Sequence, residues 1–503
     1  MAYTDEKNFP KREERINGCN AFGGRVCDLI KNSGNSCMVN SSRSFSQTCN
    51  CQLGLALTMV TTIPDSVLVL HGPVGCGSQL HSSDLYHKSG LLSRGEKPKP
   101  LIWVSSGLEE NDVINGGEKK LEEAILKVDR LHRPAAIIVL TTCSPGIIGD
   151  DVDEIVARLK NQTAAKLILT HCEGFKTKIS ASGYDAVYHG IARGLELQEE
   201  EYSHIVEDDI ERLKKEYERK ITVNVFNVFS IGRTDELELK RLLEMLGLKV
   251  RFYPNFSAVE DFKRLTWAAL NVSLCATHDD YFLKFLEEKF KMPYYIGTMP
   301  LGIRNTREWL LSIAKFFEKE AEAEKILRSE IDALKEELEP ITQAIKGKKV
   351  FITGGEIRVA VTAALMKELG CKIAGIRGHH YDPFGDAVYA QLVEDDPEIE
   401  VNIATTQVFE LVNLLNRAKP DIVLAHGGSN VWIGKLGIPS IPIFSQTQYY
   451  LGFKGVFELA RRISKAIRNT AFQKNISSNL KLPFKQDWYE KSPFTYITEL
   501  KNS

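Results

Sequence analysis

Short apolar runs alternate with longer segments of helical periodicity along most of the chain. In the first part, apolar runs of strand length lie at 66–70, 101–105, 135–142 and 165–171, and amphipathic segments lie at 53–63, 117–131, 150–160 and 183–195. Strand-length apolar runs that alternate with amphipathic helices indicate βαβ units and a parallel sheet. The pattern therefore predicts an α/β fold.

The same alternation recurs twice more and divides the chain of 503 residues into parts. Further strands are expected at 221–226, 249–253, 269–274 and 293–297, and then at the run that begins at Lys349 and at 372–376, 399–403, 421–425 and 441–443. Residues 306–347 are charged and helical, with a break expected at Pro340. We therefore expect three Rossmann-like parallel-sheet domains with flanking segments: an irregular segment at 1–50, domains at 51–220, 221–347 (with the helical bridge) and 348–470, and a tail at 471–503.

Charge and hydropathy exclude two classes of partner. The 64 basic and 66 acidic residues give a formal net charge of -2, which favours neither nucleic acid nor an anionic membrane surface. No apolar run approaches the roughly 20 residues of a membrane span. Residues 1–15 are polar and charged and do not resemble a signal peptide. We expect a cytoplasmic protein that binds neither nucleic acids nor membranes.

Three of the ten cysteines follow predicted strands of the first domain. Cys76 lies in the glycine-rich turn after the strand at 66–70, and Cys143 and Cys172 end the next two long apolar runs. Parallel α/β sheets bind ligands at the carboxyl ends of their strands. In a reducing compartment such thiols are free, catalytic or metal-bound rather than disulfide-bonded. Their placement indicates a shared site, although each thiol alone is also typical of a small buried core residue.

Thiolates in glycine-rich turns favour an iron–sulfur cluster at this site. Cys51, which precedes the helix expected at 53–63, offers another ligand, and no Cys-x-x-Cys pair favours zinc. A small cluster needs about four thiolates. One ligand is therefore still missing if the cluster is bound by Cys51, Cys76 and Cys143. Either Cys172 or a second chain completes it.

Several co-linear motifs resemble those of the nitrogenase component 1 superfamily, in its α-type subunit. They cover about residues 50–470 and comprise His71–Gly77, Asn115–Leu121, Gly146–Asp151, Cys172–Phe175, Asn271–Cys275, Thr306–Leu310, Lys419–Ile422 and Gly452–Gly455. The resemblance implies three α/β domains around a central metallocluster cavity. It also implies a homologous β-type subunit, with which an α₂β₂ heterotetramer would form.

The resemblance assigns the cysteines to two clusters. Cys51, Cys76 and Cys143 would bind an iron–sulfur cluster that bridges to the β-type subunit, either [8Fe-7S] like a P-cluster or [4Fe-4S], whereas Cys172 would not be a ligand. Cys275 would hold one end of a nitrogenase-type iron–sulfur cluster at the active site.

The chain departs from dinitrogen-reducing enzymes at the positions that surround that active-site cluster. The stretch 443–450 contains no histidine where those enzymes have a cofactor ligand, and Ser180 and Tyr184 stand in place of a glutamine and a histidine. The segment 78–84 also lacks arginine. These differences indicate a substrate other than dinitrogen.

Four residues are candidate catalytic groups. Ser180 and Tyr184 match positions over the cluster, and Tyr184 is a weaker proton donor than a histidine. His379 and His380 follow the strand at 372–376 and would face the same cavity as ligands or proton donors; the alternative is a polar loop.

The expected activity is a nitrogenase-like reductase. The sequence has no Gly-x-x-x-x-Gly-Lys-Ser/Thr phosphate loop, so we expect electrons from a separate ATP-dependent iron–sulfur reductase. Cys275 counts against tetrapyrrole reductases. A methylthio-alkane reductase, which cleaves a C–S bond of a small molecule, fits best. The alternatives are a scaffold for cofactor assembly, a divergent nitrogenase subunit, and an α/β protein without clusters.

Overall fold

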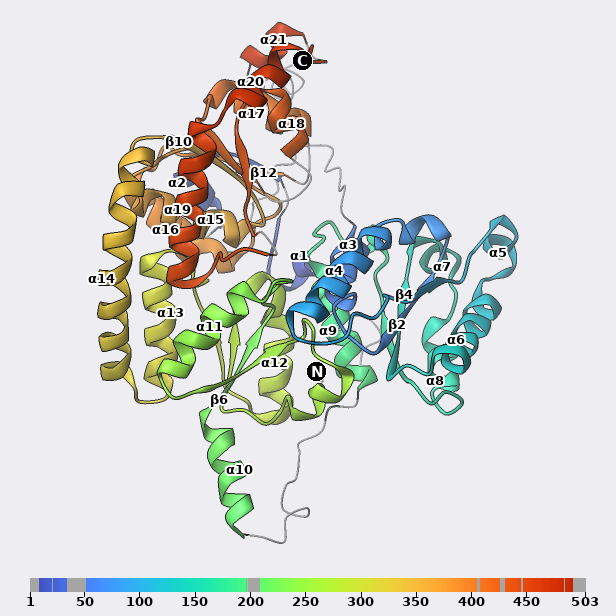
Figure 1. Ribbon diagram of the computed structural model, residues 1–503. Helices are drawn as coiled ribbons and strands as arrows, with labels where there is room; N and C mark the ends of the chain where they lie inside the picture. The colour runs from blue at the N-terminus through green and yellow to red at the C-terminus, as the bar shows by residue number, and fades with distance from the viewer. Residues whose placement is uncertain are drawn as a thin grey trace. The chain divides into compact units, whose positions relative to one another are not determined.

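Figure 1 shows the computed structural model, which describes residues 9–19, 21–33, 51–195, 197, 209–404, 408–425, 430–444, 447–483 and 485–491. These residues form three separate β-sheets, and helices connect most successive strands. All strand pairs but one are parallel. The prediction of a mixed α/β fold with Rossmann-like parallel sheets is confirmed.

The first sheet carries the glycine-rich turns. Its order is β3 (Trp103–Ser105), β2 (Ser66–His71), β4 (Ala136–Thr141) and β5 (Lys166–Thr170). Alternate residues of these strands pack on α3 (Gln52–Val60) and α9 (Ser182–Gly194) on one face, and on α6 (Glu118–His132) and α8 (Val152–Leu159) on the other (Figure 1). Because helices cover both faces, the central strands are apolar except at their ends.

The second sheet has the order β7 (Lys249–Tyr253), β6 (Thr222–Phe226), β8 (Leu270–Ser273) and β9 (Tyr294–Ile296), all parallel. Helix α10 (Asp209–Ile221) leads into β6, α11 (Thr234–Met245) connects β6 to β7, and α12 (Ala276–Phe290) connects β8 to β9. Helix α12 packs against α9 of the first sheet.

The third sheet has six strands, in the order β1 (Ala21–Arg25), β12 (Glu400–Ala404), β11 (Lys372–Gly378), β10 (Lys349–Gly354), β13 (Ile422–Ala425) and β14 (Ser440–Pro442). Its helices are α2 (Val26–Ser33), α15 (Glu356–Glu368), α16 (Asp386–Asp395), α17 (Val408–Ala418), α18 (Asn430–Lys435) and α19 (Gly452–Arg468). The remaining elements are α1 (Arg12–Arg15), α4 (Leu80–Ser93), α5 (Glu110–Asn115), α7 (Cys143–Ile148), α13 (Ile303–Phe316), α14 (Glu320–Ile345), α20 (Ala471–Ser478), α21 (Gln486–Glu490), η1 (Val74–Gly77), η2 (Gly174–Lys176), η4 (Val259–Arg264) and η5 (Pro383–Gly385).

Two local expectations are corrected. Part of the segment 1–50, expected to be irregular, forms β1 and α2, and β1 pairs antiparallel with β12. The helical bridge breaks between α13 and α14, where Glu318 has a φ of 56°, and not at Pro340, which lies inside α14. A proline removes a single backbone donor, and the rest of a 26-residue helix retains its hydrogen bonds.

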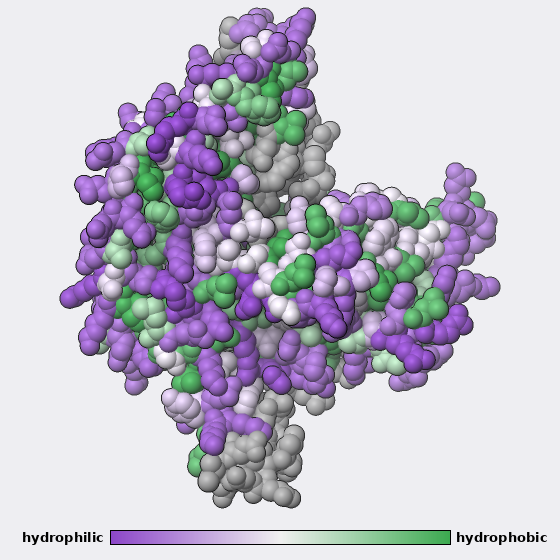
Figure 2. Space-filling model, in the orientation of Figure 1, coloured by the Kyte–Doolittle hydropathy of each residue, from purple (hydrophilic) through white to green (hydrophobic). Residues whose placement is uncertain are grey.

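The chain forms two compact units. The first unit contains Met1–Arg12, Asn50–Glu236 and Leu243–Gly297, and the second contains Glu13–Cys49, Leu237–Leu242 and Thr298–Ser503. The division into domains at 51–220, 221–347 and 348–470 stays a prediction. The surface seen in Figure 2 is mostly hydrophilic, with small separate hydrophobic patches. Among the described helices, none is both long and apolar enough to cross a membrane.

Candidate functional site

Three of the predicted ligand cysteines occupy the starts of helical segments in the first unit. Cys76 lies in η1, directly after β2; Cys143 begins α7, directly after β4; and Cys51 is the N-cap of α3. All three are partly exposed.

Gly174 shows that the cysteines share one site. A Cβ atom at Gly174 would lie 2.6 Å from the Cβ of Cys51 and 3.6 Å from the Sγ atoms of both Cys51 and Cys143. Burial raises the pKa of the Cys76 thiol, a hydrogen bond with Thr142 opposes this, and the nearby Cys143 and Cys51 add to the increase. The structure therefore brings Cys51, Cys76 and Cys143 together.

Cys172 has a different environment. Its side chain is fully buried in the apolar cluster beneath the sheet, and burial raises the pKa of its thiol well above the ordinary value. A protonated thiol in an apolar core behaves as a small hydrophobic side chain and not as a metal ligand.

His71 fixes the turn that precedes Cys76. Its Nε2 lies 2.9 Å from Asp150 Oδ2, and its Nδ1 lies 3.0 Å from Ser106 Oγ. Asp150 in turn accepts a hydrogen bond from the backbone of Gly117 at 3.0 Å. These contacts join the turns after three strands into one rigid edge of the sheet.

A second network holds Glu173 and Gly174 against the cysteines. His171 contacts Asp153 at 3.0 Å and Glu173 at 3.4 Å, and Lys176 donates to Glu173 at 3.0 Å. Burial alone would raise the pKa of Glu173, but His171 and Lys176 lower it to about 2. The side chain of Gln52 at the start of α3 donates to the Glu173 carbonyl at 2.7 Å.

Cys275 is separate from this group and is almost fully buried, at 3% exposure. It follows β8 and is the N-cap of α12, and its backbone N–H donates to Ser273 Oγ at 3.1 Å. The thiol stands at the N-terminus of a 15-residue helix, which is the positive end of the helix dipole.

Tyr184 lies beside the helix that Cys275 begins. Its ring centroid is 4.0 Å from that of His278, which is on the first turn of α12 and 8% exposed. Sequence reasoning missed His278. The spacing Cys-x-x-His at a helix start was the available signal, because residues three apart share a helix face.

Ser180 lies on the turn before α9, where its carbonyl accepts a hydrogen bond from Gly183. Gly183 is at a close contact of backbones: a Cβ there would lie 2.2 Å from the carbonyl oxygen of Gln52 in α3. Helix α9, which carries Tyr184, therefore packs closely against α3, the helix that follows Cys51.

The helices α9 and α12 are also joined by a buried arginine. Arg12 lies 3.3 Å from Asp185 on α9 and 3.0 Å from Asp280 on α12, and all three side chains are fully buried. On the same turn of α12, burial raises the pKa of Asp279 to about 7, although Ser273, Asn227 and Tyr188 donate hydrogen bonds to it.

His379 and His380 belong to the second unit and follow β11. The backbone N–H of His379 donates to the Gly354 carbonyl at 3.1 Å. The side chain of His380 is buried, and its Nε2 lies 3.7 Å from Asp382 Oδ2. Whether these histidines face the same cavity as Tyr184 stays a prediction.

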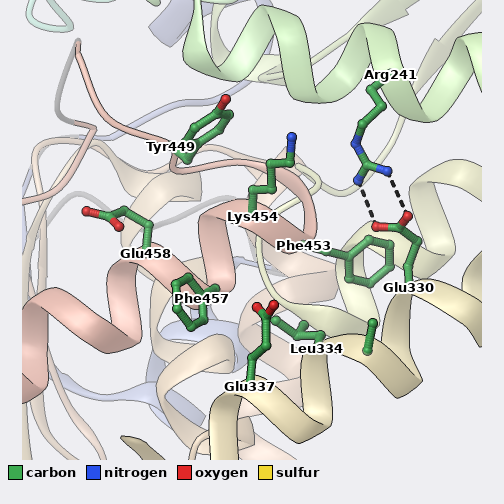
Figure 3. Close-up of a pocket in the computed structure, with 10 residues that line it drawn as sticks. Arg241, Glu330, Leu334, Glu337, Tyr449, Phe453, Lys454, Phe457 and Glu458 are labelled. Atoms are coloured by element: carbon green, nitrogen blue, oxygen red, sulfur yellow. Dashed lines mark hydrogen bonds and ion pairs between the residues drawn. The ribbon is translucent and has the colours of Figure 1, made fainter.

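The second unit also has a pocket of about 500 Å³ beside α14 and α19 (Figure 3). It contains none of the predicted site residues. Arg241 on α11 points toward Glu330 on α14, and each of two guanidinium nitrogens lies 2.7 Å from a carboxylate oxygen. These charged groups pair with one another and fasten α11 to α14.

Comparison with known proteins agrees with this architecture. The family described as Nitrogenase component 1 type Oxidoreductase matches residues 51–468. The cofactor biosynthesis protein NifE of Methanococcus maripaludis is 27% identical over 440 residues, 86% of either chain. The nitrogenase molybdenum-iron protein alpha chain of Methanosarcina barkeri is 25% identical over 470 residues, 82% of this chain and 84% of that one.

A solved structure of nitrogenase Cp1 at pH 5 shares the fold. Its TM-score is 0.68 at 21% identity, and the match covers 88% of this chain and 92% of the other. The family match spans all three sheets except β1, together with every predicted cluster cysteine. The chain therefore belongs to the nitrogenase component 1 type oxidoreductase family.

Proposed function

We propose that the chain is the catalytic α-type subunit of a nitrogenase-like reductase with two iron–sulfur metalloclusters. The convergence of Cys51, Cys76 and Cys143 around the side-chain-free Gly174 carries the proposal. Three thiols at or near helix starts match the donor set that a cluster needs, and the glycine at position 174 lets the backbone approach them closely.

The bridging cluster would be held by those three cysteines and completed by a homologous β-type subunit. Large apolar side chains surround the partly exposed cysteines: Val74, Ile147 and Phe175 are 62%, 70% and 54% exposed. Exposed apolar groups around a functional site are typical of a protein interface. Bound there, an [8Fe-7S] or [4Fe-4S] cluster would relay electrons between the subunits of an α₂β₂ heterotetramer.

The active-site cluster would be held at one end by Cys275. The buried thiol at the positive end of α12 suits a ligand to such a cluster. When bound, the cluster supplies electrons for substrate reduction. His278 and Tyr184 would deliver protons, with Ser180 as a further polar group, and His379 and His380 would act as ligands or proton donors.

The substrate would be a small methylthio-alkane. Ser180 and Tyr184 replace the glutamine and histidine of dinitrogen-reducing enzymes, and 443–450 lacks the histidine ligand. Reduction adds two electrons and two protons across the C–S bond and gives methanethiol and a hydrocarbon. Because the sequence has no phosphate loop, an ATP-dependent iron–sulfur reductase would supply the electrons.

Two other functions have specific support. The similarity to NifE, a cofactor biosynthesis protein, favours a scaffold on which a precursor cluster matures. The similarity to the molybdenum-iron protein alpha chain favours a divergent nitrogenase subunit. Turnover assays distinguish these functions.

The test begins with anaerobic purification of the chain with its β-type partner and measurement of iron by EPR and chemical analysis. Cys275→Ala should remove the active-site cluster and keep the bridging one, and Cys76→Ala should do the reverse. Cys172→Ala is the matched control, because its thiol lies in the apolar core, and it should keep both clusters.

Activity is then assayed with the ATP-dependent reductase and dimethyl sulfide, with methanethiol and methane measured by gas chromatography. Product formation that requires Cys275 supports the reductase. Absence of product, together with transfer of the cluster to an apo-protein, supports the scaffold instead. A preparation without iron contradicts both.

A further inference from the structure

Three side chains that can bind a metal ion meet in the second unit. Two of them belong to the Gly-His-His-Tyr-Asp turn, of which the reductase proposal uses only the histidines. Glu356 begins α15, and His380 and Asp382 lie between β11 and η5. One ligand atom of each residue lies within 4.8 Å of the other two. Their exposures are 1%, 6% and 0%.

The turn orients these groups toward one another. The backbone N–H of Asp382 donates to Glu356 Oε2 at 3.3 Å. One carboxylate oxygen of Asp382, Oδ1, accepts from the backbone N–H of Phe384 at 3.1 Å, and the other, Oδ2, faces His380 Nε2 at 3.7 Å. The carboxylates are therefore positioned by backbone contacts from within the same turn.

His380 provides an independent sign that a ligand belongs here. Its Nε2 is buried and makes no hydrogen bond within the described part of the chain, and 3.7 Å to Asp382 is too long for one. Leaving a buried polar nitrogen without a partner costs free energy, because the group has lost its hydrogen bond to water. A metal ion in contact with this nitrogen would remove that cost.

We propose that Glu356, His380 and Asp382 bind one divalent transition-metal ion of the Mn²⁺, Fe²⁺ or Zn²⁺ class. One imidazole nitrogen and two carboxylate oxygens suit these ions. Bonds of about 2.0–2.2 Å require the side chains to draw together slightly from their present separation. Water fills the remaining positions.

The ion would clamp the start of α15 to the turn after β11. It would also make His380 a ligand to a single ion and not a proton donor. The site lies wholly within the second unit, and it is independent of whether the protein is a reductase or a scaffold, since Cys275 and the cluster cysteines belong to the first unit.

The probe is Mn²⁺, because thiolates favour softer ions and compete weakly for it. The full chain with its partner subunit is stripped of loose metal and titrated with Mn²⁺, and free Mn²⁺ is measured by room-temperature EPR. We expect one tight site in the wild type. His380→Gln and Asp382→Asn should weaken it at least about tenfold, whereas the neighbouring His379→Gln should not.

A second measurement avoids the risk that the variants fail to fold. Electron spin echo modulation of Mn²⁺ in the wild type should show one directly bound ¹⁴N nucleus. Absence of tight Mn²⁺ binding, absence of the ¹⁴N modulation, or equal binding by folded His380→Gln and wild type would each overturn the proposal. The iron content of the same samples reports separately on the clusters.

Discussion

At the residue scale, the cysteine site depends on Gly174 having no side chain. In Gly174→Ala the new methyl group would lie 2.6 Å from Cys51 Cβ, so Cys51 must move. We expect a loss of stability of about 1–3 kcal/mol from overpacking and loss of most of the bridging-cluster iron, while the signal of the Cys275 cluster remains. Iron analysis and EPR measure both effects.

The control for this change is Gly434→Ala in α18, where a Cβ would meet nothing within 4 Å. It should leave the iron content unchanged. If Gly174→Ala also keeps its bridging iron, the three cysteines do not hold the cluster in the way proposed.

Because the pKa of His171 is shifted, the stability that this residue gives to the segment with Gly174 depends on pH. Burial opposes the charged ring, but hydrogen bonds with Asp153 and Glu173 outweigh this and raise the pKa above 6.5. The charged His171 ring therefore contributes its full stabilisation of the folded protein below pH 6.5. This contribution is lost as the pH rises through the folded-state pKa of His171. His171→Gln should cost about 1.5–3 kcal/mol at pH 6 and less at pH 9.

Denaturant unfolding of both proteins across this range measures the difference. His132→Gln, at an exposed histidine at the end of α6, should cost little at either pH. A penalty for His171→Gln that is the same at pH 6 and pH 9 would show that the ring is not charged in the folded protein.

His278 is the residue that the structure adds to the site. A positioned general acid contributes about 10²–10⁴ in rate, so His278→Gln should lower kcat for C–S cleavage by a factor in that range. Iron content and cluster EPR should stay at the wild-type level. Turnover that is unaffected by His278→Gln but abolished by Tyr184→Phe would assign proton delivery to Tyr184 alone.

The sequence located the cysteines but not His278, and the reason is physical. A thiol that directly follows a predicted strand is placed by that strand at the carboxyl edge of the sheet, so Cys76 and Cys143 could be located from the sequence. His278 is one of 11 histidines, and its value comes from the contact of its ring with that of Tyr184, a residue 94 positions away. Nothing local to α12 encodes that contact.

At the element scale, buried parallel strands were predictable because both of their faces are apolar. The strand expected at 249–253 coincides with β7, and the others differ at their ends by a few residues. The strand β1 was not predictable: its five residues include Gly23 and Gly24, and glycine disfavours strands. It forms because the free edge of β12 offers a complete row of backbone partners.

Helices α9 and α3 pack so closely that there is no room for one added carbon atom between them. A Cβ at Gly183 would lie 2.2 Å from the Gln52 carbonyl oxygen, and backbone cannot move aside as a flexible side chain can. Gly183→Ala should therefore destabilise the protein by about 1–3 kcal/mol, measured by denaturant unfolding. Gly434→Ala should be neutral or stabilising by up to about 1 kcal/mol, as helix propensity predicts.

At the scale of the whole chain, residues far apart in sequence assemble the first unit. Cys51, Cys76 and Cys143 come from three separate helical segments. The helix that carries Tyr184 and the helix that Cys275 caps are joined by Arg12, near the beginning of the sequence. Sequence patterns predict the helices but not this link, because a charged residue in a polar N-terminal segment is normally solvent-exposed.

Arg12→Ala tests this long-range link. Removal of the guanidinium leaves Asp185 and Asp280 buried without its charge, and breaking a buried ion pair in this way costs about 3–5 kcal/mol. The matched control is Arg25→Ala, whose pair with Glu398 is about 60% exposed on both sides and contributes at most about 1 kcal/mol. Urea unfolding of the three proteins measures the difference. If Arg12→Ala costs no more than Arg25→Ala, the other contacts between α9 and α12, such as the Tyr188–Asp279 hydrogen bond, hold the two helices together. If it costs the larger amount, the N-terminal segment is part of the support for the active-site helices, and Arg12→Ala should also weaken retention of the Cys275 cluster.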